Sequence, residues 1–278
     1  MSRHLYQESL TSLPLGKPVE YPNRYTPSLL EAVPRSVNRI PLGIEGNLPF
    51  NGEDLWNAYE FSWLNSKGKP NVAMLVCRVP AVSPNIIESK SFKLYLNSFN
   101  EHRFDTVEEV KSLLIKDLSE VAGSQITVDI LGLNDQSLWI SQLQGECIDD
   151  LDISIDQYQP NSALLSVNTE KKTEKSLISH LLKSNCLITN QPDWGSLLIR
   201  YQGAEINERS LLKYIVSFRE HNEFHEQCVE RIYCDIMKQC NPDKLSVLAR
   251  YTRRGGLDIN PFRSNFESPP KNIRLIRQ

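Results

Sequence analysis

A cysteine and an aspartate lie seven residues apart in the stretch of this sequence with the clearest chemical potential, residues 184–195. A short apolar run surrounds Cys186, and Pro192 and Gly195 predict a turn that presents Asp193 near the thiol. A hairpin of this kind lets both side chains face one pocket. A thiol can act as a nucleophile and a carboxyl group as a proton donor. Most cysteines only pack in the core, and the spacing alone favours that interpretation.

His225 and Glu226 form a second candidate pair, at the beginning of a helix predicted over residues 224–239. A histidine at a helix terminus can transfer protons near neutral pH. A glutamate carboxylate can accept two hydrogen bonds from the amidine-like edge of a purine or pterin. A surface pair on an amphipathic helix is the alternative, and the sequence leaves both interpretations open.

A metal site is a third interpretation of this region. His221, His225 and Cys228 follow the spacing i, i+4, i+7, which would place three zinc ligands on one helical face. The zincin pattern requires glutamate after the first histidine, but Asn222 stands there. The sequence defines no further ligand. We therefore expect an organic site without a metal ion.

Two further stretches suit anions. Apolar spacing predicts a helix over residues 87–99, and its first turn would hold Glu88, Ser89 and Lys90, where backbone N–H groups are unpaired. Residues 253–256 read Arg-Arg-Gly-Gly, which combines forked donors with a backbone that a phosphate can approach. For the helix, spacing alone favours an ordinary capped end with solvated lysines, and for residues 253–256 a turn with solvated charge is the alternative. No Gly-x-Gly-x-x-Gly follows a predicted strand, so a Rossmann domain is not indicated.

The elements that must position these groups follow from apolar periodicity. Strands are predicted over residues 55–63, 71–79, 125–133, 163–167, 177–189, 196–201 and 245–251, with shorter ones at 138–140 and 151–155. Helices are predicted at residues 28–32, 87–99, 207–218 and 224–239, and one opens at Thr106, where Thr106 and Glu109 form a capping box.

An internal echo predicts a duplication. Residues 98–102, Ser-Phe-Asn-Glu-His, resemble residues 217–221, Ser-Phe-Arg-Glu-His, and each stretch follows one helix and precedes another. The simplest explanation is a repeated strand–strand–helix–helix–strand–strand unit. Such a repeat predicts an α+β fold of antiparallel sheets with paired helices on one face. We expect an arm over residues 1–50 and modules over 51–168 and 169–278, with the boundary at the charged residues 169–175.

Composition limits the class of protein. The chain has 278 residues, 40% hydrophobic content and a net charge of −3, which favours a folded protein without a general attraction for nucleic acid or anionic membranes. Its beginning lacks a signal-peptide pattern, and no apolar run is long enough for a membrane span. Six cysteines without a Cys-x-x-Cys pair predict a reduced, cytoplasmic protein. The proline-rich arm has apolar residues that predict docking, namely Tyr21, Tyr25, Leu29, Leu30 and Ile40.

Several of these segments together resemble the NADPH-dependent 7-cyano-7-deazaguanine reductases, the nitrile reductases of queuosine biosynthesis. The resemblance rests on residues 88–95 (Glu-Ser-Lys-Ser-Phe-Lys-Leu-Tyr), 184–195, 224–226 and 253–256, and it extends from roughly residue 10 to the end of the chain. It implies a tandem tunnelling fold (T-fold), NADPH as cofactor, a homodimer and a role in tRNA modification.

The resemblance also implies roles for individual residues. Cys186 is similar to the nucleophile that forms a covalent thioimide with the nitrile, and Asp193 to the acid that protonates its nitrogen. The residues that resemble the family's substrate contacts are Ile86, Ile87, Glu88, His225 and Glu226. Those that resemble its cofactor contacts are Ser89, Lys90, Arg254 and Gly255.

Two alternatives stay open beside this reductase. One is a zinc-dependent hydrolase of the GTP-cyclohydrolase type, which shares the T-fold. The other is a non-catalytic purine-binding protein or tRNA-modification scaffold. The acidic net charge argues against direct binding of nucleic acid.

Overall fold

The computed structural model describes residues 24–137 and 139–278 and shows a mixed α+β fold. The chain forms two compact units, each built from separate stretches of sequence. In the described residues the first unit comprises 24–45, 54–137 and 253–258, and the second comprises 46–53, 139–252 and 259–278. The charged residues 169–175 lie inside a strand of the second unit, so the structure divides the chain at an earlier point than the predicted boundary.

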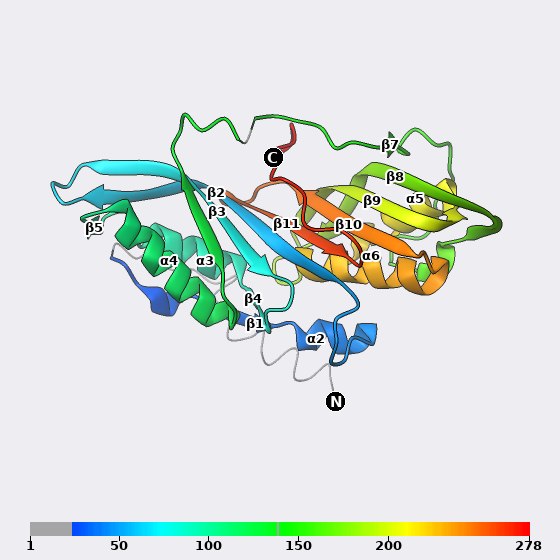
Figure 1. The fold of residues 1–278 in the computed structure, drawn as a ribbon, viewed down its shortest axis with the longest axis horizontal. Helices are drawn as coiled ribbons and strands as arrows, with labels where there is room; N and C mark the ends of the chain where they lie inside the picture. The colour runs from blue at the N-terminus through cyan, green and yellow to red at the C-terminus, as the bar shows by residue number, and fades with distance from the viewer. Residues whose placement is uncertain (1–23, 138) are drawn as a thin grey trace. The chain divides into compact units, whose positions relative to one another are not determined.

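The first unit is built on the hairpin of β2 and β3, and β6 pairs with β3 in antiparallel fashion. Helices α3 and α4 cover one face of these strands (Figure 1). The short β5 pairs with the end of β2, and β1 pairs with β4 beside them. The bounds are β1 (Ala32–Pro34), α2 (Ser36–Arg39), β2 (Asn51–Asn65), β3 (Pro70–Pro80), β4 (Asn85–Ile87), α3 (Ser89–Asn97), β5 (Arg103–Phe104), α4 (Val107–Ala122) and β6 (Thr127–Leu131).

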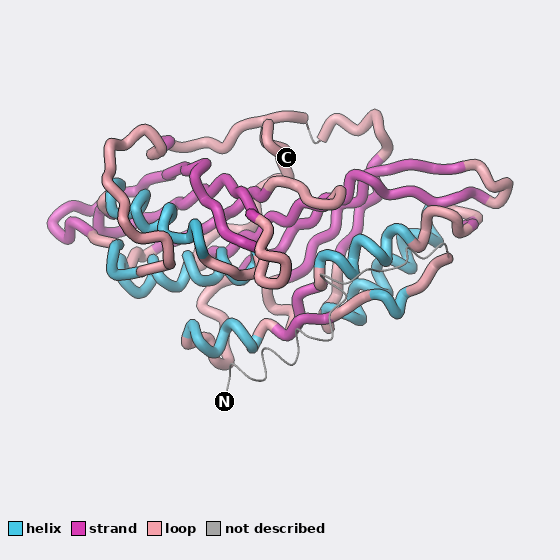
Figure 2. The backbone as a smooth tube through the Cα atoms, turned by 180° about the vertical axis from the view of Figure 1, so that it is seen from behind, coloured by secondary structure: helices cyan, strands magenta, loops and turns pink. Residues whose placement is uncertain are grey.

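The second unit repeats this plan. A long hairpin of β8 and β9 is extended by β10 and β11, all antiparallel, and the short β7 runs parallel to β8. Helices α5 and α6 cover one face of this sheet, as Figures 1 and 2 show. The bounds are β7 (Glu146–Cys147), β8 (Val167–Asn185), β9 (Pro192–Ile206), α5 (Glu208–Val216), α6 (His225–Cys240), β10 (Lys244–Tyr251) and β11 (Leu257–Ser264).

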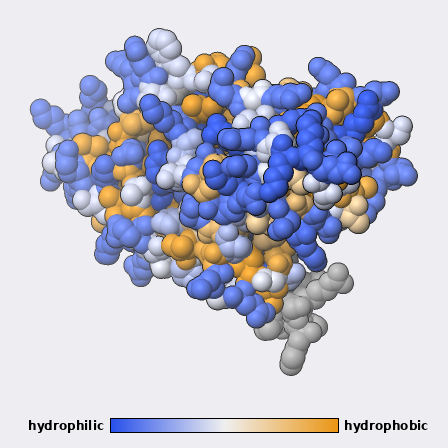
Figure 3. Space-filling model, turned by 45° about the vertical axis from the view of Figure 1, so that its right-hand side comes forward, coloured by the Kyte–Doolittle hydropathy of each residue, from blue (hydrophilic) through white to orange (hydrophobic). Residues whose placement is uncertain are grey.

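Apolar alternation explains why the second sheet takes this form. Leu197 and Ile199 of β9 are buried on the side of the two helices, and Leu198 between them joins a cluster on the opposite face. Leu143, from the segment before β7, packs against the cluster that contains Leu198. Both faces of the sheet centre are therefore covered. On the outer surface in Figure 3, hydrophilic side chains surround smaller hydrophobic patches.

The predicted duplication is confirmed in the helix pairs. Helices α3 and α5 each have nine residues, and α4 and α6 each have sixteen. In the first unit the Tyr95 hydroxyl donates to Asp117 Oδ2 at 2.7 Å, and in the second the Tyr214 hydroxyl donates to Asp235 Oδ2 at the same distance. Both units thus retain one buried polar tie between their two helices.

Several predicted elements need correction. Residues 192–195 do not form a turn: they begin β9, and the turn lies at residues 187–189. Proline is compatible with the first residue of a strand, so Pro192 does not end one here. Residues 151–155 are not a strand, and of residues 163–167 only Val167 belongs to one, because a 3-10 turn (Ser162–Leu164) and two irregular residues precede β8. Of residues 138–140, only Ile140 makes an isolated bridge, and residue 138 lies outside the described residues.

Residues 24–50, the described part of the arm, are docked, but not by all of the predicted anchors. Tyr25 packs against Phe99 with ring centroids 5.2 Å apart, and its hydroxyl donates to Asp117. Ile40 is 55% exposed, so it is not an anchor, and Tyr21 lies outside the described residues. The helix predicted at residues 28–32 is a single 3-10 turn, Pro27–Leu29, before β1.

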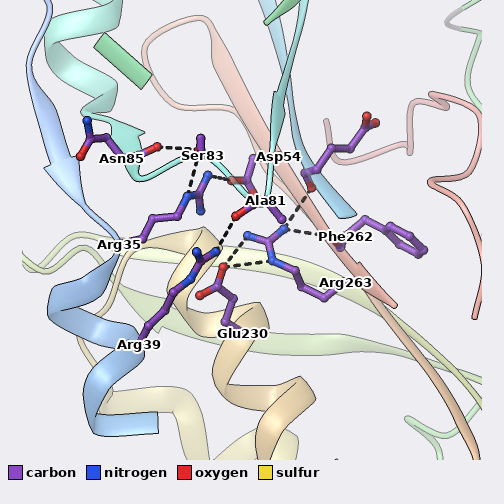
Figure 4. A network of polar contacts seen from close by, with 10 residues as sticks. Arg35, Arg39, Asp54, Ala81, Ser83, Asn85, Glu230, Phe262 and Arg263 are labelled. Atoms are coloured by element: carbon purple, nitrogen blue, oxygen red, sulfur yellow. Dashed lines mark hydrogen bonds and ion pairs between the residues drawn. The ribbon is translucent and has the colours of Figure 1, made fainter. Parts of the chain in front are cut away.

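Each unit also buries an arginine beside a carboxylate (Figure 4). In the first unit Arg35 pairs with Asp54 and donates to Ser83 Oγ at 3.2 Å. In the second, Arg263 of β11 donates to Glu230 Oε1 of α6 through Nε and Nη2, at 3.1 and 2.8 Å. Strand β11 was not predicted from the sequence because Asp258, Asn260 and Arg263 interrupt its apolar pattern, although the structure buries all three.

We expect Tyr214→Phe to lower the free energy of unfolding by about 1–3 kcal/mol, because it removes the buried donor to the half-buried carboxylate of Asp235. Urea unfolding should show a lower midpoint with an unchanged slope. The control is Tyr158→Phe, at a ring that is 39% exposed. Equal midpoints for the two variants would contradict the importance of the tie between the helices.

Candidate active site

Cys186 directly follows the last residue of β8, and its backbone is held on both sides. Its N–H donates to the carbonyl of Gln191 at 2.8 Å, and its carbonyl accepts from the N–H of Asn190 at 3.0 Å. Asn222 Nδ2 also donates to the Cys186 carbonyl, at 3.1 Å. Asn190 has a left-handed backbone (φ 57°), which asparagine tolerates well. The cysteine therefore lies in a tightly bonded turn and is only 6% exposed.

A β-bulge decides which way this cysteine faces. Ser179 pairs with Leu197, whereas Leu182 pairs with Gly195, so one extra residue of β8 is accommodated between these pairs. After the bulge Ser184 pairs with Asp193. Side chains directly opposite each other lie on the same face, and residues two apart on one strand also share a face. Cys186 follows Ser184 by two residues, so strand alternation directs it to the face of Asp193.

His225 completes the group on this face. Its Nε2 lies 3.3 Å from Asp193 Oδ2, close enough for an ion pair but without the alignment of a hydrogen bond. The imidazole stacks on the ring of Tyr251, with centroids 3.9 Å apart and planes 18° from parallel. Burial raises the pKa of Tyr251, so its phenol stays neutral. The histidine is thus held flat beside the carboxylate.

His225 and Glu226 occupy the first turn of α6, as the sequence predicts. Phe224 is the N-cap, and its backbone N–H lies 3.5 Å from the side-chain oxygen of Gln227. His225 and Glu226 lie where the helix dipole favours negative charge. This position suits the buried carboxylate of Glu226. Within the described residues His225 Nδ1 is buried without a hydrogen-bond partner. A buried polar atom of this kind is a candidate ligand contact.

The zinc interpretation fails geometrically for His221. It lies before α6, not on it, and its Nε2 contacts Glu223 Oε2 at 2.9 Å. Within residues 24–137 and 139–278 no three His, Cys, Asp or Glu side chains form a group suited to a metal ion. Cys228 is fully buried, and burial raises its pKa to about 12, so it packs as a neutral thiol.

The first unit holds the other predicted substrate contacts. Ile86 and Ile87 are buried in β4, where Ile87 pairs with Ala32 of β1. Glu88 is the N-cap of α3, one position before the predicted first turn. Its carboxylate accepts the backbone N–H groups of Lys90 at 2.9 Å and Ser91 at 2.7 Å.

This capping changes the role expected for the helix end. The N–H groups that were predicted to suit an anion already bind the Glu88 carboxylate. Burial raises the pKa of Glu88, while the two N–H bonds oppose that rise. A carboxylate has about four lone-pair sites, so two bonds leave acceptor capacity for a ligand.

The first unit also brings the predicted cofactor contacts together. Residues 253–256 form a turn in which the Arg254 N–H donates to the Leu257 carbonyl at 2.8 Å. Gly255 has φ +58°, and an added Cβ would lie 3.0 Å from Lys93 Cδ. Since Lys93 lies on α3, the Arg-Gly turn runs beside the helix that begins with Ser89 and Lys90.

The predicted residues therefore fall into two sets. Cys186, Asp193, His225 and Glu226 belong to the second unit, and the remaining predicted contacts belong to the first. Three residues that support the second set were not predicted from the sequence, namely Tyr251, Asn222 and Glu223. Their only signal was proximity to motif residues along the chain, and their contacts depend on the fold.

On a duplicated α+β scaffold, Asp193 thus lies beside the imidazole of His225, and strand alternation directs the buried Cys186 to the same face. Residues 21–130 match the family described as nitrile reductase, 7-cyano-7-deazaguanine-reductase N-term, and residues 192–270 match the family described as QueF-like protein. A curated relative from Dechloromonas aromatica (strain RCB), NADPH-dependent 7-cyano-7-deazaguanine reductase, is 58% identical over 268 residues, which cover 95% of each chain. The chain belongs to this nitrile reductase family.

In the part of the chain that the structure describes, the helices are too short or too polar to cross a lipid bilayer.

Alkylation of the native protein should separate its thiols. We expect iodoacetamide at pH 8 to label the exposed Cys147 fastest, Cys186 more slowly and Cys228 slowest of the three, because Cys228 is fully buried with a raised pKa. Mass spectrometry of peptides over time gives the three rates, and urea-unfolded protein gives the reference. Labelling of Cys228 as fast as that of Cys147 would contradict this order.

Proposed function

We propose that this protein catalyses the NADPH-dependent four-electron reduction of 7-cyano-7-deazaguanine to 7-aminomethyl-7-deazaguanine, a step of tRNA queuosine biosynthesis. The observation that carries the proposal is the turn in which Cys186 shares a sheet face with Asp193, and Asp193 lies 3.3 Å from His225. The relative from Dechloromonas aromatica has this activity in its name and is 58% identical.

In the proposed first step the S–H of Cys186 adds across the nitrile. The sulfur bonds to the nitrile carbon, one C–N π bond breaks, and the nitrogen gains a proton, which gives a thioimide. Nitriles are weak electrophiles, so attack has to be coupled to proton delivery. The carboxylate of Asp193 takes the proton from the thiol and passes it to the nitrogen. His225 lies beside the carboxyl group, and its ring is stacked on Tyr251.

The proposed substrate contacts include one buried glutamate in each unit, Glu88 in the first and Glu226 in the second. A guanine-like edge presents adjacent N–H donors, and a carboxylate can accept two of them. Glu226 is buried at the start of α6, and Glu88 is fixed by two backbone N–H groups with acceptor capacity to spare. Ile86 and Ile87, buried in β4 directly before Glu88, are the other proposed substrate contacts of the first unit.

The residues of the first unit fit a phosphorylated cofactor. Lys93 lies beside Gly255, Arg254 precedes it in the turn, and Lys90 is in the first turn of the helix that carries Lys93, so donors suited to phosphate lie on both segments. Bound NADPH supplies hydride, two equivalents for each nitrile. Ser89, Lys90, Arg254 and Gly255 hold and orient it.

Four finer features belong to the same proposal. We assign the repeated unit to the T-fold, because each copy has a long antiparallel hairpin, two helices on one face and a returning strand. We also propose a homodimer, a cytoplasmic location and no direct contact with nucleic acid, in keeping with the net charge of −3.

Cys186→Ala should abolish the covalent adduct, because the bond to the nitrile requires the sulfur. With substrate and without NADPH, intact-mass spectrometry should show wild type heavier by one substrate molecule and the variant unchanged. Cys147→Ala, which removes an exposed thiol, is the matched control and should form the adduct normally. An adduct on Cys186→Ala, or activity that a zinc chelator removes, would refute the proposal and favour the hydrolase.

Gly255→Ala should raise the KM for NADPH about tenfold, because the new methyl group would press on Lys93 beside the proposed cofactor contacts. Gly43→Ala is the matched control. It also has a positive φ (+75°), so it carries similar backbone strain, but an added Cβ there meets nothing within 4 Å. Steady-state NADPH oxidation measures both. A similar KM in the two variants would remove the turn from the cofactor site.

A further inference from the structure

We propose that Glu223 is a positioning residue that sets the placement of Cys186 relative to His225. The inference rests on the proposed function of Cys186 as nucleophile. Glu223 lies in the loop before α6 and has no place in the reaction derived above. Its backbone is bonded to the strand that carries the cysteine, and its side chain is bonded to the helix that carries the histidine.

The side chain of Glu223 is 3% exposed and accepts three hydrogen bonds. Arg231 of α6 donates through Nε at 3.0 Å to Oε2 and through Nη2 at 2.7 Å to Oε1, a two-point geometry that fixes the direction of the carboxylate. His221 Nε2 contacts Oε2 at 2.9 Å. A buried carboxylate with these partners is costly to replace, because each partner would be left in a poorly hydrated site.

The backbone of the same loop is bonded to the end of β8. The N–H of Asn185 donates to the carbonyl of His221 at 2.7 Å, and the N–H of Glu223 donates to the carbonyl of Asn185 at 3.1 Å. Residues 221–223 thus act as a short parallel partner of β8 at its last residue. Cys186 is the next residue along the chain. Any movement of Glu223 is therefore transmitted to the nucleophile through a single peptide unit.

Arg231 lies six residues after His225 on the same helix, so Arg231 and the histidine move as one rigid element. The contact from Arg231 to Glu223 and the backbone bonds from Glu223 to Asn185 complete a connection between thiol and imidazole. The sulfur must meet its carbon while a proton is delivered to the adjacent nitrogen. A displacement of about 1 Å can cost roughly a hundredfold in rate.

Glu223 acts by placement and not by proton transfer. Burial alone would raise its pKa, but the hydrogen bonds from His221 and Arg231 outweigh burial and hold the pKa below its ordinary value. The carboxylate consequently stays ionised near neutral pH. Its charge also stabilises Arg231, whose pKa is raised by the same pairing against the opposing effect of burial.

The test is Glu223→Gln, which keeps the shape of the side chain and removes its charge. Two rates are measured: adduct formation with the nitrile substrate in the absence of NADPH, and iodoacetamide labelling of Cys186 relative to Cys228. We expect adduct formation to slow by about ten- to a hundredfold. We expect the labelling ratio to rise about tenfold, because the loop that holds Cys186 opens locally, and the KM for NADPH to stay unchanged.

Glu230→Gln is the matched control. It breaks another buried glutamate–arginine pair on α6, with Arg263, away from the end of β8. It should accelerate the labelling of Cys186 and Cys228 by the same factor, as a general loss of stability does. Its adduct should form at the wild-type rate per folded molecule.

The outcomes separate the two hypotheses. Wild-type protein that forms no adduct would refute the proposed function. In that case the ratio of Cys186 to Cys228 labelling in Glu223→Gln would still test whether Glu223 positions Cys186. A wild-type labelling ratio in Glu223→Gln, or an equal rise for Cys186 and Cys228, would overturn the positioning role. A ratio that rises equally in Glu230→Gln would overturn it as well.

Discussion

The candidate active site depends on the pairing register between β8 and β9. In antiparallel strands the side chains alternate between faces, so a shift of one residue moves each side chain to the opposite face. Ahead of the bulge, Leu177 lies on the helix-covered face with its partner Ile199. Beyond it, Ser184 takes that face opposite Asp193. Without the extra residue, the thiol two positions later would point away from the carboxylate, and no later contact could restore it.

The helices then determine what the sulfur and the carboxylate meet. Helix α6 begins with His225 and Glu226 because Phe224 has an extended backbone and serves as N-cap. The stacked ring of Tyr251 comes from β10, which pairs with β9 opposite Gly195. The ring fits against Gly195 because glycine has no side chain. An added Cβ there would lie only 3.3 Å from the ring. Three elements distant in sequence thus form one small polar site above an apolar core.

The duplication explains how one scaffold supports two kinds of site. Both units retain the tyrosine–aspartate tie between their helices, because it stabilises the packing of each pair. The helix N-caps have diverged: Glu88 caps α3, whereas Asn207 caps α5. The groups proposed for the cofactor lie in the first unit and the thiol lies in the second. Duplication therefore preserved the core and left the strand and helix ends to vary.

The sequence by itself determined the two helix pairs, the capping at Thr106 and Asn207, the repeat and the motif residues, because these features depend on local periodicity and on side chains within one turn. It did not determine the turn at residues 187–189, the bulge of β8 or the buried β11. Those features depend on pairing between distant strands, and β11 hides its polar residues by bonding them to partners elsewhere in the fold. Only the tertiary structure decided that Cys186 faces Asp193 and that Glu223 joins them to α6.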